Sequence, residues 1–178
     1  MEEVVIPNWL RAMDVLVGAL SIALCGLVLL GLVTSSIAIL ILLTIALFMV
    51  GFARFARAAT VKPKGTSRRV INLVAGLIGV GTASIIIFNI GFPDEYLLAL
   101  LATAWMIMGL ARVSIGIIEK DVQMWARILQ IVVGLTTLAF TVLVILNPSA
   151  EFSAVLLLIL VVVIVNGFAR TSRGYVGV

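Results

Sequence analysis

Long apolar stretches, joined by short polar segments, determine what this chain of 178 residues can fold into. An α-helix of about 20 residues, rising about 1.5 Å per residue, crosses the ~30 Å hydrocarbon core of a bilayer. Six stretches of roughly this length occur, at residues 11–33, 37–53, 70–88, 96–111, 127–146 and 152–169. They are apolar on every side, whereas the strands of a transmembrane barrel alternate polar and apolar positions. The sequence therefore predicts an all-α integral membrane protein with six transmembrane helices.

The composition agrees with a bilayer environment and excludes several kinds of site. Hydrophobic residues make up 63% of the chain and charged residues only 11%, against about 25% charged residues in soluble domains. The single cysteine cannot form an internal disulfide, and the absence of histidine removes the commonest metal and haem ligand. No nucleophile with a base, and no facing pair of carboxylates, can be assigned. We therefore expect no enzymatic activity, no metal ion and no cofactor.

The positive charges predict how the helices are oriented. If the six stretches span the membrane, all 12 lysines and arginines fall on one side of it. The turns on the other side, at residues 34–36, 89–95 and 147–151, contain none and carry Asp94, Glu95 and Glu151 instead. Cytoplasmic segments retain lysine and arginine. We therefore expect an integral protein of the cytoplasmic membrane, with both termini in the cytoplasm.

A repeat of 58 residues organises the chain. Gly-Phe-Ala-Arg at 51–54 returns as Gly-Leu-Ala-Arg at 109–112 and as Gly-Phe-Ala-Arg at 167–170. Within the single membrane domain 1–178, the repeats are 1–58, 59–116 and 117–174. Each repeat is predicted to be a two-helix hairpin, so all three share one orientation and are expected around a pseudo-threefold axis along the membrane normal.

Each tetrapeptide is expected to mark the point where the second helix of a hairpin leaves the membrane. Residues 54–69 are then predicted as a basic loop, residues 112–126 as a partly helical loop, and residues 170–178 as a tail. The basic loop has no aromatic side chain between residues 62 and 69 to stack on bases, so anionic lipid is its expected partner and nucleic acid is not.

Glycines recur at matching positions of the repeats. Helices in lipid associate through close backbone approach, which small residues permit. The glycines expected to pack helices together are Gly18, Gly51, Gly76, Gly109, Gly134 and Gly167.

Polar residues also recur inside the first helix of each repeat. Asp14, Asn72 and Gln130 are offset by 58 residues, and polar groups within a span are a functional hypothesis because they cost free energy there. Around a threefold axis they would share one depth and could line a path for protons or solutes. The alternative is structural: hydrogen bonds between helices near the interface, or a local ion pair of Arg11 with Asp14. The residues alone leave both open.

Six arginines are expected at the cytoplasmic boundary. They could contact lipid head groups or an anion, or they could be ordinary anchors whose long side chains reach the membrane surface. The six are Arg11, Arg54, Arg69, Arg112, Arg127 and Arg170.

The repeated hairpin resembles the HdeD family of small multipass membrane proteins. The resemblance is carried by the glycine early in each first helix, by Pro93 and Pro148 at the far turns, and by the glycine near the end of each second helix. In the first repeat, Ser35-Ser36 replaces the turn proline. The resemblance implies six helices and an association with acid-stress resistance, and it supplies no catalytic residues.

Two classes of function follow from these features. The first is a non-enzymatic structural or accessory protein, with membrane lipids as partners, acting as a homo-oligomer or beside other membrane subunits. The second is a small channel or transporter with a polar path near Asp14, Asn72 and Gln130.

Overall fold

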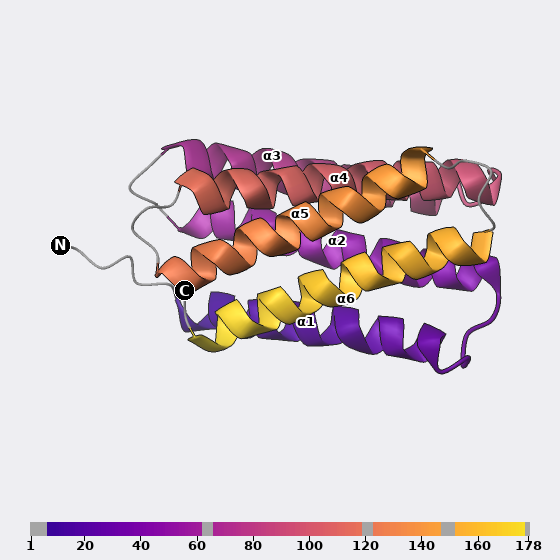
Figure 1. Ribbon diagram of the computed structural model, residues 1–178, viewed down its shortest axis with the longest axis horizontal. Helices are drawn as coiled ribbons and strands as arrows, with labels where there is room; N and C mark the ends of the chain where they lie inside the picture. The colour runs from indigo at the N-terminus through magenta and orange to yellow at the C-terminus, as the bar shows by residue number, and fades with distance from the viewer. Residues whose placement is uncertain (1–6, 62–65, 119–122, 147–151, 177–178) are drawn as a thin grey trace.

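The structure is a computed structural model, and residues 7–61, 66–118, 123–146 and 152–176 are described. Within these ranges the chain forms six α-helices and no strand (Figure 1). All six are long and apolar enough to cross a membrane, which confirms the predicted all-α class and number of spans. The helices are α1 (Asn8–Leu29), α2 (Ser36–Thr60), α3 (Thr66–Phe88), α4 (Asp94–Ile118), α5 (Met124–Leu146) and α6 (Phe152–Val176).

The even-numbered helices lie at the centre of the bundle. Helices α2, α4 and α6 contact one another, and each odd-numbered helix packs against two of them. The most extensive contacts are α2 with α3, α4 with α5, and α6 with α1, so the first and last helices lie side by side (Figure 1). The closest pairs therefore join consecutive repeats, in cyclic order, rather than the two helices of one predicted hairpin. Pseudo-threefold symmetry itself stays a prediction.

The six repeated glycines lie in these closest pairs. A Cβ added to Gly76 on α3 would lie 2.9 Å from the carbonyl oxygen of Gly51 on α2. A Cβ added to Gly134 would lie 2.9 Å from the Gly109 oxygen, and a Cβ added to Gly167 would lie 2.9 Å from the Gly18 oxygen. Because real Cβ atoms do not approach backbone so closely, glycine is what lets these helix backbones meet.

The even-numbered helices continue beyond the predicted membrane exits. Arg54, Arg112 and Arg170 each lie six residues before the last residue of their helix. At about 1.5 Å per residue, each helix runs about 9 Å further than its tetrapeptide. The predictions of a loop from residue 54 and of a tail from residue 170 are therefore wrong in these parts. Arginine is a good helix former, and these side chains turn inward, so the first cation does not end the helix.

The first repeat turns without a proline because a glycine ends its first helix. Gly31, just after α1, has a φ of +69°, a left-handed conformation that glycine adopts without a steric penalty. Its N–H donates to the carbonyl oxygen of Val28 at 3.0 Å, and the Leu32 N–H donates to that of Leu27 at 3.1 Å. This Schellman arrangement satisfies carbonyls at the end of α1.

The centre of the bundle is apolar on one side of the arginines. Two sets of large side chains from α2, α4 and α6 lie seven and eleven residues before the three arginines, and their exposure is at most 1%. We call these residues the apolar layer: Leu43, Leu47, Leu101, Trp105, Ile159 and Val163. They belong to one hydrophobic core, so a tightly packed apolar region adjoins the arginines on this side.

Candidate functional site: a buried arginine centre

The arginine of each tetrapeptide is buried at the centre of the bundle. Arg54 is 5% exposed, Arg112 is 1% exposed and Arg170 is 3% exposed. The sequence placed these residues at the membrane boundary, with head-group contacts or surface anchoring. The structure buries all three side chains inside the bundle, so they do not extend along its outer surface as anchors would. Their depth in the membrane and their contact with head groups or an anion stay predictions.

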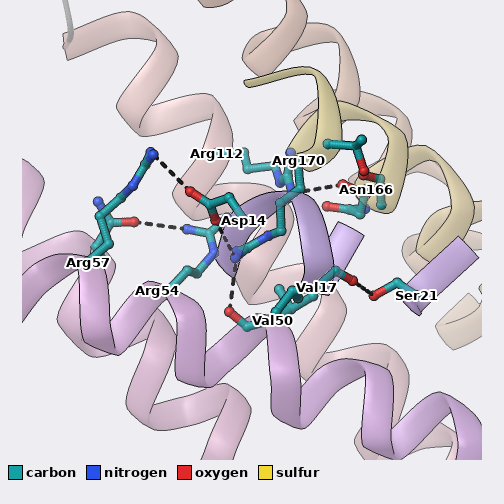
Figure 2. Close-up of polar contacts among 12 residues, drawn as sticks. Asp14, Val17, Ser21, Val50, Arg54, Arg57, Arg112, Asn166 and Arg170 are labelled. Atoms are coloured by element: carbon teal, nitrogen blue, oxygen red, sulfur yellow. Dashed lines mark hydrogen bonds and ion pairs between the residues drawn. The ribbon is translucent and has the colours of Figure 1, made fainter. Parts of the chain in front are cut away.

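The three buried arginines tie the even-numbered helices into a closed cycle. Each Nη2 donates to the backbone carbonyl that immediately precedes the tetrapeptide glycine of another even helix, and two of these bonds are drawn in Figure 2. The bonds are Arg54 to Met108 at 3.3 Å, Arg112 to Asn166 at 3.5 Å, and Arg170 to Val50 at 3.3 Å. They are long for hydrogen bonds, so we attribute the position of the side chains as much to burial as to these contacts.

Asp14 is the carboxylate of this centre. Its Oδ1 accepts from Nη1 of Arg170 at 2.8 Å, and its Oδ2 pairs with Nη2 of Arg57 at 2.9 Å (Figure 2). Both oxygens are therefore engaged by cations from helices other than its own. The local ion pair with Arg11, considered from the sequence, is replaced by these contacts, since Arg11 donates to the Gly174 and Tyr175 carbonyls at 3.4 and 3.1 Å.

The other two members of the polar set also lie at the centre. Asn72 accepts from Nη1 of Arg54 at 3.4 Å and donates to the carbonyl oxygen of Arg68 at 3.1 Å. Gln130 is 3% exposed and lines the same pocket as Asp14 and Asn72. The structure thus brings together the three positions that the 58-residue offset selects.

The second group of three arginines has a different place. Arg69 Nε donates to the Ala58 carbonyl at 3.0 Å, and Arg127 Nε donates to the Gly116 carbonyl at 3.2 Å. Arg11 makes the corresponding bond to Gly174 on α6. Each satisfies a carbonyl in the last turns of an even helix, where a cation is favoured by the helix dipole. The six arginines that the sequence treated alike therefore form a buried group and a peripheral group.

A small pocket lies beside Arg54 and Arg170 of the buried group. Its volume of about 20 Å³ is room for about one or two water molecules. Further arginines missing from the sequence-based site line it beside Asp14, Asn72 and Gln130: Arg57, Arg68 and Arg173. Their spacing in the sequence could have indicated two of them. Arg57 follows Arg54 by three residues, and Arg173 follows Arg170 by three, so each pair shares a helix face.

The fold and this centre define an integral membrane protein with six helices around a buried cluster of arginines. In the described part of the chain, no three His, Cys, Asp or Glu side chains gather as a metal site would require. Comparisons with protein-family models, curated proteins and solved structures found no match. The resemblance to the HdeD family therefore remains a prediction from the sequence.

Proposed function

We propose that this chain is a non-enzymatic, HdeD-like structural or accessory protein of the cytoplasmic membrane, with both termini in the cytoplasm. The observation that supports this most is the cycle of Arg54, Arg112 and Arg170, which links three central helices beneath the apolar layer. Polar groups that bond to one another and to backbone carbonyls act as connections within a bundle. A role in acid-stress resistance is part of the proposal and rests on the resemblance alone.

The odd-numbered helices supply the surface for the proposed partners. They expose large apolar side chains along their length, which suits lipid tails or the helices of another subunit. These side chains include Leu16, Leu20 and Leu27 on α1, Val74, Leu77 and Ile85 on α3, and Ile128, Val132 and Leu135 on α5.

Association with other chains is the direct test of the accessory role. Purified in a mild detergent and measured by native mass spectrometry, the protein should carry the mass of more than one 19.0 kDa chain, or of one chain with another subunit. A single 19.0 kDa chain with bound lipid alone, across several mild detergents, would contradict the proposal.

A channel or transporter is the second candidate, favoured by one observation. Asp14, Asn72 and Gln130 line a common pocket, as a polar path would require. The apolar layer above that pocket argues against a continuous path. We therefore expect proteoliposomes containing the protein to pass protons and small ions no faster than empty liposomes. A flux that the wild type supports and Asp14→Asn abolishes would favour the transporter and overturn the structural role.

A further inference from the structure

Positive charge exceeds negative charge in the central pocket. The arginines that line it are Arg54, Arg57, Arg68, Arg170 and Arg173. Among the described residues that line it, Asp14 is the sole carboxylate. Both of its oxygens already pair with Arg57 and Arg170. Arg112 is a further buried cation of the bundle, but it does not line the pocket, and it bonds to a neutral carbonyl.

Three guanidinium groups that line the pocket keep a donor without a partner. The Nε atoms of Arg54, Arg57 and Arg170 are buried and make no hydrogen bond. Such donors are rare in folded proteins, and a buried cation without a counter-charge destabilises the folded state. An anion within reach of these groups would remove part of this cost, because ionised acceptors make the strongest hydrogen bonds with guanidinium.

We propose that the pocket binds a phosphate-type oxyanion between the arginines of α2, α3 and α6. The planar guanidinium presents its N–H groups as a fork that matches the oxygens of phosphate, which a lone ammonium does not. The pocket has room for only about one or two water-sized groups, so it takes oxygens of a phosphate group at its mouth rather than a bulky organic anion. Asp14 and the neutral amides of Asn72 and Gln130 complete its wall.

The more exposed arginines of the pocket lie toward one end of the bundle. Arg57, Arg68 and Arg173 are half-buried or partly exposed and form a rim at the end of the bundle where α2 and α6 finish. Arg54 and Arg170 are more deeply buried, and the apolar layer lies on the far side. The anion therefore enters from the arginine-rich end, either as free phosphate or as the phosphate of a lipid head group.

Thermal unfolding of the purified protein in a neutral detergent tests the site. Phosphate in the millimolar range, at ionic strength held constant with chloride, should raise the midpoint by several degrees, as expected for a ligand that binds the folded state. Constant ionic strength matters because general screening also relieves repulsion between arginines. Equal midpoints in phosphate and chloride would overturn the proposal, and would indicate that screening, or the chain's own acidic residues outside the described ranges, balances the charge.

Matched arginine variants locate the effect. Arg54→Gln should abolish the phosphate-dependent shift, whereas Arg69→Gln should retain it, since Arg69 lies in the peripheral group and caps α2 through the Ala58 carbonyl. Both variants remove one positive charge from neighbouring helices. Loss of the shift in both, or in neither, would contradict binding at this pocket.

Asp14→Asn should strengthen phosphate binding, whereas the arginine variant of the pocket abolishes it. A purely structural role of Asp14 would not produce this increase. The variant loses stability without phosphate, but its affinity for phosphate should rise about tenfold, because a negative charge no longer competes for Arg57 and Arg170. An unchanged or lower affinity would overturn the proposed contacts. This measurement also tests the site if Arg54→Gln fails to fold.

Thermal unfolding in nanodiscs of different lipid composition shows whether the ligand is free phosphate or a lipid head group. In phosphatidylcholine alone, free phosphate should stabilise the protein as it does in detergent. If phosphatidic acid in the bilayer raises the midpoint and removes the response to free phosphate, the ligand is a lipid head group. If the response to free phosphate persists beside phosphatidic acid, the ligand is the free anion. Absence of both responses would overturn the site.

Discussion

Replacing Asp14 with alanine should lower the free energy of unfolding by about 3–5 kcal/mol, the usual effect of removing one partner of a buried ion pair. The loss arises because Arg170 is 3% exposed and would keep its charge in the interior without the carboxylate at 2.8 Å. Arg57 would lose its partner at 2.9 Å as well. Reversible unfolding in mixed micelles of a mild detergent and SDS, followed by circular dichroism, measures the change.

The control is an aspartate that has no such partners. Asp94 lies in the first turn of α4 and is only partly buried, so Asp94→Ala removes mainly a helix-dipole interaction of about 0.3–1 kcal/mol. Adding Arg170→Met to Asp14→Ala should recover part of the lost stability, since the unpaired cation is then gone. Equal effects of Asp14→Ala and Asp94→Ala, or no recovery in the double variant, would contradict the buried ion pair.

The type and number of the helices follow from the sequence because each span must be apolar over a length set by the bilayer. Where the helices end does not follow so directly. The apolar run in α2 stops at Ala53, but the helix continues to Thr60 because Arg54 and Arg57 turn toward Asp14 and Asn72. A cation at the end of an apolar run is compatible both with a membrane exit and with an inward-facing side chain.

For the same reason, the sequence predicted only part of the candidate site. The 58-residue offset selected Asp14, Asn72 and Gln130, because polar residues within spans are conspicuous. It did not reveal which arginines face inward, since that depends on partners distant in the sequence. Asp14 and Arg170 are 156 residues apart and meet because α1 packs against α6.

Gly76→Ala should lower the free energy of unfolding by about 1–3 kcal/mol, as expected for overpacking a tight contact. The added Cβ would lie 2.8 Å from the backbone nitrogen of Phe55 and 2.9 Å from the Gly51 oxygen, so helices α2 and α3 would have to separate. Gly81→Ala, on the same helix, is the matched control. No atom of a neighbouring element lies within 4 Å of its added Cβ, so stability should stay unchanged or rise by up to about 1 kcal/mol.

The equivalent glycine of the next repeat turns this prediction into a test of the repeat itself. At Gly134 an added Cβ would lie 2.9 Å from the Gly109 oxygen and 3.0 Å from the backbone nitrogen of Val113, nearly the environment of Gly76. If the pairs α2–α3 and α4–α5 are equivalent, Gly134→Ala should destabilise the protein as much as Gly76→Ala, within about 0.5 kcal/mol, and the two losses should add because the sites share no partner. Losses that differ by more than about 1 kcal/mol would mean that the matching glycines do not carry matching packing, and pseudo-threefold symmetry would then describe the sequence but not the energetics.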